Sequence, residues 1–232
     1  GWSDLVGFRR YQFEPNRKIT LNRVREFVAG AGLELIRGNL DHAMVRALRF
    51  NSFMVSHVQT TGVHLLWSRN RNNAQNRYLY LFVKKGTVEI EGDEAHWSSK
   101  GGGLCIIFPG DSPVHIRFTE ISELIFFSFD QKEVAPHMLT PENVGEVSPS
   151  STVFRASFAY LQAVVHAPVG EVELAEDPII LHAITRDVAR AVTMSAIAAR
   201  HPDPDLATMP APTSQRSADP DLTPDTLPSL FG

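Results

Sequence analysis

The spacing of apolar residues divides the chain into a strand-rich middle and a helical part that follows it. Between residues 43 and 129, short apolar runs are separated by turn residues at close intervals, a pattern typical of an antiparallel sandwich or barrel. After Pro136 the apolar residues recur three or four positions apart, which is the period of an amphipathic helix. The pattern therefore predicts a mainly β protein with appended α-helices.

Within the strand-rich middle, the clearest strand signal is the apolar run 78–83, which is followed by Lys84-Lys85-Gly86 and then by residues 87–91. Gly86 can adopt the positive φ that a tight reversal needs, so we predict a hairpin here. A second reversal is predicted at Gly92-Asp93. Three more runs lie at residues 104–108, 114–118 and 124–129, which gives at least six strands, enough to close a barrel or a double sheet.

The run 78–83 is apolar at every position. A strand that is apolar on both faces is buried on both faces. We therefore expect a barrel interior on one side of this strand and a helix or a second subunit on the other.

Helices are predicted on both sides of the strand-rich middle. Residues 20–30 are predicted to form a short helix that Thr20 can cap and Gly30 can end, and we expect it to plug or cover another part of the protein. A helix also covers residues 154–165, and another starts at Asp177 and Pro178 and runs to about Arg200. Two consecutive amphipathic helices need a partner surface, which is either the barrel or a second copy of the chain.

The apolar stripes of these last two helices are the predicted dimerisation contacts. They are Phe154, Phe158, Leu161, Val165, Leu181, Ile184 and Val188. The chain as a whole is divided into an N-terminal segment with a short helix (1–42), a β-barrel (43–139), a helical dimerisation region (140–200) and a Pro-rich tail or linker that we expect to be disordered (201–232).

Composition places the chain among ordinary globular proteins and restricts its partners. The 232 residues are 43% hydrophobic and 21% charged, close to the average for soluble domains. A net charge of −4 argues against a nucleic-acid-binding surface, which needs clustered Lys and Arg. The start of the chain lacks the features of a signal peptide, and no apolar run is long enough to cross a membrane, so we expect a cytoplasmic protein.

Catalytic constellations are missing from the sequence. No His-x-His pair is present, and His64 and His115 are the only histidines on strands that would line a barrel. A metal needs three or four converging ligands, so no metal, no other cofactor and no catalytic residue is predicted. The glycine-rich stretches near Gly30 and Gly102 lack the order of residues that a nucleotide-binding loop requires.

Aromatic residues on the strands are the candidates for a ligand pocket. In such a pocket a few polar groups orient a small organic ligand among apolar walls. The alternative is that these rings fill the core. For His115, alternation with Val114 and Ile116 predicts an outward side chain if those two face the interior. The predicted ligand contacts are His64, Trp67, Tyr78, Tyr80, Phe108 and His115.

Several of these segments together resemble a known family. They are the strand and glycine turn at 78–86, the glycine loop at 101–103, the run from Leu104 through Asp111-Ser112-Pro113 to His115, and the closing strand 124–130. In this order they resemble the N-terminal regulatory domain of AraC-type transcription factors. The helices that follow resemble the family's helical linker, while Gly102-Gly103 departs from it because the family tends to place an acidic residue after the glycine.

The resemblance implies a cupin-like, jelly-roll type β-barrel followed by a helical pair. It implies a small organic effector in the barrel and a homodimer. DNA would be contacted only through two helix-turn-helix units that the printed sequence does not contain. Two other functions remain open at this point: a metal-dependent cupin oxygenase or isomerase, and an oligomerisation module without a ligand.

Overall fold

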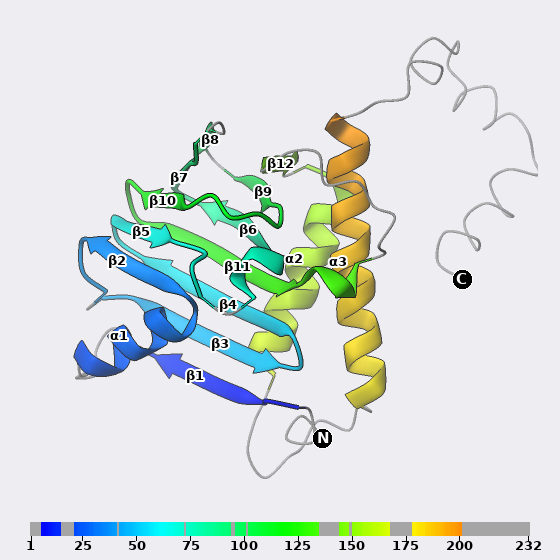
Figure 1. Cartoon of the computed structure of the whole chain (residues 1–232), viewed down its shortest axis with the longest axis horizontal. Helices are drawn as coiled ribbons and strands as arrows, with labels where there is room; N and C mark the ends of the chain where they lie inside the picture. The colour runs from blue at the N-terminus through cyan, green and yellow to red at the C-terminus, as the bar shows by residue number, and fades with distance from the viewer. Residues whose placement is uncertain are drawn as a thin grey trace, which may run out of the picture. The chain divides into compact units, whose positions relative to one another are not determined.

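The computed structural model describes residues 6–14, 21–40, 42–71, 73–93, 96–100, 102–134, 144–148, 150–167 and 178–200. The strands form two antiparallel sheets (Figure 1). The seven-stranded sheet has the order β1 (Arg9–Phe13), β3 (Met44–Phe50), β4 (Phe53–Thr60), β11 (Ser122–Asp130), β6 (Arg77–Lys85), β9 (Gly103–Ile107) and β12 (Val144–Val147). The five-stranded sheet has the order β2 (Leu33–Arg37), β5 (Val63–Trp67), β10 (Val114–Phe118), β7 (Thr87–Glu91) and β8 (His96–Lys100).

Three α-helices confirm the helical segments expected from the sequence. They are α1 (Leu21–Gly30), α2 (Thr152–Val165) and α3 (Pro178–Arg200), and two short 3₁₀ helices are η2 (Ala74–Asn76) and η3 (Gln131–Glu133). The hydroxyl of Ser151 caps α2 by accepting hydrogen bonds from the amides of Val153 and Phe154. The predicted cap Asp177 and the tail 201–232 lie outside the described residues. No helix in the described ranges is long and apolar enough to cross a membrane.

The two sheets pack face to face around an apolar core. On β6, Leu79, Leu81 and Val83 point toward the other sheet. Ile116 and Phe118 of β10 meet them from the five-stranded sheet. Because side chains alternate along a strand, the remaining residues of β6 point to the outer face of the seven-stranded sheet.

That outer face is covered by α2 and α3, which lie side by side against it (Figure 1). Phe82 packs against Phe154 of α2 with ring centroids 5.8 Å apart. The hydroxyl of Tyr80 hydrogen-bonds Thr193 and donates to the carbonyl of Ala189 on α3. The partner surface of the two helices is therefore the chain's own sheet, and the expectation that β6 is buried on both faces is confirmed.

One predicted hairpin is wrong. β6 pairs with β11 and β9, whereas β7 pairs with β10 and β8, so the two strands lie in different sheets. Gly86 does adopt the expected positive φ of 93°, and a Cβ there would fall 2.7 Å from the carbonyl oxygen of Ile121. The glycine reverses the chain in a crowded corner, but the reversal carries the chain from one sheet to the other. The reversal at Gly92-Asp93 is confirmed, because β7 and β8 pair directly.

The N-terminal segment supplies an edge strand to each sheet in addition to its helix. β1 pairs with β3 and β2 pairs with β5. Between these two edges lies α1, whose Phe27 packs against Tyr11 and Phe13 of β1. In the described part of the chain the two sheets stay separate, with no backbone pairing that joins one to the other. The chain divides into two units, Gly1–Ile197 and Ala198–Gly232, and the packing described here belongs to the first.

Candidate functional site

A cavity of about 520 Å³ lies between the two sheets. Its volume falls in the range typical of small-molecule sites. Residues 27–33, at the end of α1 and just after it, form one side of the wall. The inward positions of β3, β4, β5, β6 and β11 supply most of the rest.

The cavity has a polar end and an apolar end. Along β4, the lining residues run from Met54 through Ser56 and Val58 to Thr60. The register with β11 places Ser128 beside Met54 and Leu124 beside Val58. Side chains near Met54 are polar or charged. Toward the other end of β4 they are apolar, and there the wall is formed by Val45, Val58, Val63, Leu65, Phe118 and Phe126.

Basic side chains gather at the polar end, where Arg49, Arg71, Arg77 and Lys132 all line the wall. The Nε of Arg77 donates to the hydroxyl of Ser128 at 3.1 Å, and its second guanidinium nitrogen donates to the carbonyl of Ser52 at 2.8 Å. Burial, and next the positive charge of Arg49, lower the pKa of Arg77 to about 10. Both acceptors of Arg77 are neutral oxygens.

Two hydroxyl groups in the wall lack a hydrogen-bond partner. Ser56 and Thr60 are 2% and 3% exposed, and neither side-chain oxygen bonds any described residue. Both belong to the cavity wall. A buried hydroxyl without a partner costs on the order of 1–3 kcal/mol, so a polar atom of a guest that reaches either one gains a hydrogen bond at little expense.

Of the six predicted ligand contacts, Trp67 alone lines the cavity. Its ring is braced by Arg69, whose guanidinium carbon lies 4.2 Å from the ring centroid, a cation–π contact. Burial lowers the pKa of Arg69 to about 10. The same guanidinium donates to the carbonyl of Phe108.

The expectation for Tyr78, Tyr80 and Phe108 is corrected. These three rings lie in the core beneath α2 and α3, on the opposite face of the sheet from the cavity. The physical reason is strand alternation, because Leu79 and Leu81 occupy the inward positions of β6. These aromatic residues fill a core, which was the alternative that the sequence left open.

His64 and His115 lie on the outer face of the five-stranded sheet, away from the cavity. Val114 and Ile116 face the interior, so the predicted outward orientation of His115 is confirmed. The two rings bond each other through Nε2 of His64 and Nδ1 of His115 at 2.8 Å. Burial, followed by the nearby charge of Arg117, lowers the pKa of His64. Within the described ranges, no group of three or more His, Cys, Asp or Glu residues is arranged to hold a metal ion.

The predicted dimerisation contacts are mostly committed to the chain's own core. The structure buries Phe154, Phe158, Leu161, Val165 and Leu181 against the seven-stranded sheet. Val188 is half-buried against the same core. Ile184 is exposed, with 41% of its surface accessible, and it remains available to a second copy.

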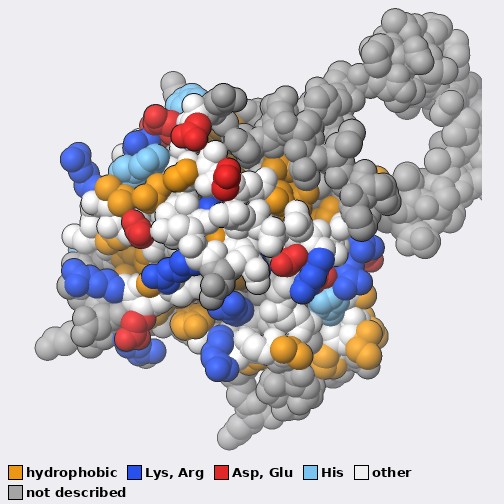
Figure 2. Space-filling view, viewed as in Figure 1, with side chains coloured by type: hydrophobic (Ala, Val, Ile, Leu, Met, Phe, Trp, Pro, Cys, Tyr) orange, Lys and Arg blue, Asp and Glu red, His pale blue; other side chains and the backbone are white. Residues whose placement is uncertain are grey.

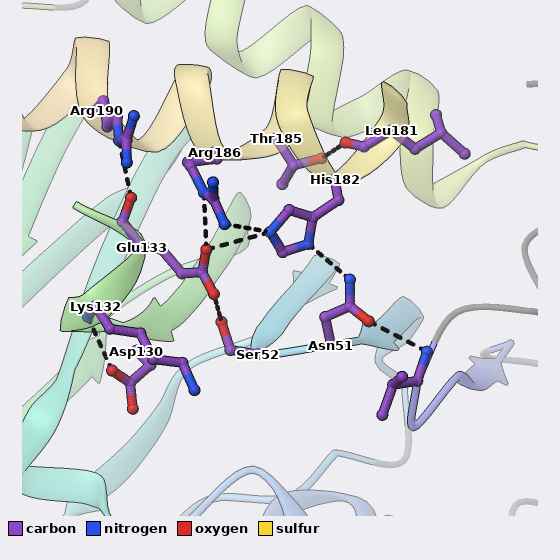
Figure 3. Close-up of polar contacts among 11 residues, drawn as sticks. Asn51, Ser52, Asp130, Lys132, Glu133, Leu181, His182, Thr185, Arg186 and Arg190 are labelled. Atoms are coloured by element: carbon purple, nitrogen blue, oxygen red, sulfur yellow. Dashed lines mark hydrogen bonds and ion pairs between the residues drawn. The ribbon is translucent and has the colours of Figure 1, made fainter. Parts of the chain in front are cut away.

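A polar cluster connects the polar end of the cavity to α3 (Figure 3). Its centre is Glu133, a buried residue at the end of η3. The carboxylate accepts from the hydroxyl of Ser52 at 2.9 Å and from Nε of Arg186 at 3.1 Å, and it lies 3.3 Å from Nε2 of His182. Arg190 donates to the backbone carbonyl of Glu133 at 3.0 Å. We call these residues the Glu133 cluster.

The N-terminal segment joins the same cluster through Asn51. The side-chain nitrogen of Asn51 lies 2.6 Å from Nδ1 of His182. The amide of Val6 donates to the side-chain oxygen of Asn51 at 3.1 Å, and the amide of Asn51 donates to the carbonyl of Val6 at 2.6 Å. Ser52 and Lys132 line the cavity, while their neighbours Asn51 and Glu133 hold α3. The same two turns therefore shape the cavity and anchor the helix.

Sequence reasoning missed most of this site. One available signal was β4, where Ser56 and Thr60 occupy inward positions that an ordinary strand fills with apolar residues. Polar residues at the buried phase of a strand often mark a cavity or a site. The Glu133 cluster had no such signal, because its members come from three distant stretches of the chain, namely the turn at Ser52, η3 and α3.

No protein-family model matches the sequence, and no curated protein matches it either. Among solved structures, the crystal structure of the AraC-like transcriptional activator CuxR is similar over 82% of this chain and 70% of that one, with 15% sequence identity and a TM-score of 0.55. The likeness establishes the fold. The chain has a β-rich fold that it shares with the structure of that AraC-like activator.

Other solved structures give weaker matches. A cupin domain from Schizosaccharomyces pombe aligns over 43% of this chain and 69% of that one, with 14% identity and a TM-score of 0.32. The EutQ protein of Clostridium difficile aligns over 54% and 88%, with 19% identity and a TM-score of 0.32.

Proposed function

We propose that this chain is the effector-sensing and dimerisation part of an AraC-type transcription regulator. A small organic molecule enters the cavity and changes how α3 and the N-terminal segment are held. The carrying observation is the Glu133 cluster, which ties the turns at the polar end of the cavity directly to α3. In the finer form of this proposal, α1 and the two sheets act as a jelly-roll barrel around the guest.

The route from guest to helix is short. Arg77 in the cavity wall holds the carbonyl of Ser52, and the hydroxyl of Ser52 holds the carboxylate of Glu133. Glu133 in turn holds Arg186 of α3. Suppose the turns at Ser52 and Glu133 have two arrangements, each linked to its own position of α3. A guest that binds one arrangement more tightly then favours the linked position of α3, by the difference in its binding free energy between the two arrangements.

We assign the output to a homodimer formed through α3. Its exposed face carries Ile180, Ile184, Ala191 and Met194 at alternating four- and three-residue spacing, with Asp187 between them. The three large side chains are 54%, 41% and 60% exposed, and Figure 2 shows hydrophobic surface at the lower right, where Figure 1 places the start of α3. A heptad spacing suits a second copy of the same helix across a two-fold axis.

The remaining roles follow from the same proposal. The domain works in the cytoplasm without a cofactor or a catalytic step. DNA is contacted by helix-turn-helix units outside the printed sequence. Side chains of both charge signs are interspersed on the face drawn in Figure 2, which suits a domain that does not itself bind a polyanion.

The test combines a binding screen with hydrogen exchange. Thermal shift across a metabolite panel identifies a binder, and exchange of α3 amides is then compared with and without it in the wild type and in Ser52→Ala. The expected result is that the binder slows exchange over Leu181–Arg190 in the wild type and has little effect there in Ser52→Ala. Ser68→Ala, which removes an exposed hydroxyl bonded to Asn70, is the matched control and keeps the wild-type response.

Three outcomes contradict the proposal. If the binder slows amide exchange in α3 of Ser52→Ala as much as in the wild type, the effect does not pass through Ser52 and Glu133. Stoichiometric iron, manganese or zinc in the purified protein favours a metal-dependent cupin enzyme instead. A stable dimer that no metabolite stabilises favours an oligomerisation module without a ligand.

A further inference from the structure

The geometry points to a specific class of guest, a small organic carboxylate with an apolar body. Its carboxylate meets Arg49 and Arg77, and its body lies toward Phe118 and Phe126. This inference rests on the proposed function and names the chemistry of the effector.

The first argument is the environment of Arg77. Its guanidinium is half-buried, and within the described residues it bonds only the hydroxyl of Ser128 and the carbonyl of Ser52. No carboxylate lies within ion-pair distance of it in that part of the chain. Asp130, the register partner of Arg77 on β11, offsets the effects of burial and of the Arg49 charge only in part, and an incompletely compensated cation held away from water is costly. An anionic guest therefore gains a charge-assisted bidentate partner that the protein does not supply.

The second argument is the balance of charge around the polar end. Arg49 occupies an inward position of β3 and makes no hydrogen bond or ion pair with the described residues. Arg71 and Lys132 add two further cations to the lining. Asp130 is the one acidic residue among the described lining residues, and its carboxylate already accepts the backbone amide of Lys132 at 2.9 Å. The net field at this end attracts a negative group and repels a positive one.

The third argument is the apolar end. Val58, Val63, Phe118 and Phe126 offer a surface without charge, and burial of an apolar body against it is favourable. Phe126 lies opposite Ser56, two residues along β4 from Met54 and about 7 Å away, so the head and body of one small guest are able to reach both kinds of wall. The unpartnered hydroxyl of Ser56 lies between them and accommodates one polar substituent on the body.

The discriminating experiment compares probes that differ in one part only. The full chain is titrated calorimetrically with octanoate, octanol, octylamine and acetate. Octanoate is expected to bind at least tenfold more tightly than octanol, since a hydrogen bond to a charged group contributes on that order. Octylamine is expected not to bind, because its head is repelled, and acetate is expected to bind far more weakly because it lacks a body.

Variants locate the head group. Arg49→Gln removes an exposed side chain that makes no hydrogen bond with any residue that the structure describes, so the fold is expected to stay intact. The change is expected to weaken octanoate binding about tenfold and to leave octanol binding unchanged. Arg77→Gln has the same expected selectivity. Arg117→Gln is the matched control, since Arg117 lies on the outer face and pairs with Glu91, and it leaves all affinities unchanged.

The failures of the two proposals are distinguishable. Octanol or octylamine binding as tightly as octanoate overturns the carboxylate class, and so does acetate binding as tightly as octanoate. Octanoate that fails to bind also overturns the class, even when another metabolite stabilises the protein and the sensing function stands. If no metabolite at all stabilises the protein, the sensing function itself fails.

Discussion

The two faces of the seven-stranded sheet are built from the same strands but differ in kind. On the outer face, Phe53, Phe127 and Phe129 pack with ring centroids 5.0 to 6.1 Å apart under the helices. On the inner face a cavity of about 520 Å³ remains. Phe126 and Phe127 are neighbours on β11 and point to opposite faces. Alternation therefore tells which residues share a face, but it does not tell whether that face is filled.

Side-chain size accounts for the difference. The outer positions of β4, β6 and β11 carry mostly large rings, which pack against one another beneath α2 and α3. The inner positions of the same sheet include Ala47, Ser56, Thr60 and Ser128, which are too small to reach the opposite sheet. The hollow is thus encoded by small and hydroxylated residues on the inner face, whereas on β6 the aromatic residues Tyr78, Tyr80 and Phe82 all lie on the packed outer face.

The largest expected effect is a difference in unfolding free energy between alanine variants of Phe127 on the outer face and its neighbour Phe126 on the inner face. Phe127→Ala opens a void in the packed outer core and is expected to cost about 3–5 kcal/mol of the free energy of unfolding. Phe126→Ala enlarges a cavity that already exists, so it is expected to cost about half as much. Urea unfolding of both variants measures the two values. Equal costs at the two positions contradict a filled outer face and a hollow inner one.

The next effect concerns the cluster that links the inner face to α3. Glu133→Ala removes the acceptor of Ser52 and Arg186 and is expected to cost about 1–3 kcal/mol, with faster amide exchange over the first turns of α3. Glu91→Ala breaks an exposed ion pair with Arg117 and is expected to cost at most about 1 kcal/mol. If the Glu133 variant is as stable as the Glu91 variant, the cluster does not anchor the helix.

A smaller effect is pH-dependent and belongs to the outer face. Nδ1 of His166, just after α2, lies 3.1 Å from a donor nitrogen of Arg46, and its Nε2 lies 2.7 Å from Nδ1 of His57. The other ring nitrogen of His57 meets Glu123 at 2.9 Å. Since Arg46 only donates, Nε2 of neutral His166 donates to His57, and His57 donates to Glu123. A proton added to His166 breaks this directed chain.

Burial, then the charges of His57, Arg46 and Arg10, lower the pKa of His166 from its ordinary 6.5, and Glu123 opposes them in part. The folded state therefore binds fewer protons than the unfolded state just below pH 6.5. Stability from this group is complete above pH 6.5 and is lost as the pH falls. Unfolding free energies at about pH 5 and about pH 8 are expected to differ less in His166→Gln than in the wild type, while exposed His42→Gln keeps the wild-type difference. If the pH-dependent difference in unfolding free energy is the same in His166→Gln as in His42→Gln, His166 is not its source.

The smallest effect on the fold tests the exposed face of α3. Ile184→Glu is expected to change the unfolding free energy of the monomer by no more than about 0.5 kcal/mol and to convert a dimer to a monomer in sedimentation experiments. Ile121→Glu, at an exposed isoleucine on another part of the surface, is the control and keeps the dimer. A dimer that survives the Ile184 change places the interface elsewhere.

Much of the local structure was predictable because it depends on neighbouring residues. Periodicity located α1, α2 and α3, while the predicted caps Thr20 and Asp177 lie outside the described residues. Alternation predicted that His115 faces outward. The doubly apolar run of β6 predicted a strand buried on both sides. Each of these inferences needs only the period of an element and the residue types on its faces.

What escaped prediction depends on which strands become neighbours. Arg49 and Arg77 reach one cavity because β3 and β6 are separated in the sheet by β4 and β11, an order that no local pattern encodes. The predicted hairpin failed for the same reason, since Gly86 sends β7 to the other sheet. The sequence analysis places Tyr78 and Tyr80 in a pocket because they are aromatic. The run of β6 is apolar throughout, so its composition does not distinguish the inward face from the outward one.

The central claim, that a guest between the sheets alters how α3 is held, is tested most directly by amide hydrogen exchange of the full chain with its tightest binder. The account predicts slower exchange in two places at once, along β4 in the cavity wall and over Leu181–Arg190 on the other side of the sheet. Slower exchange along β4 with an unchanged α3 would contradict it.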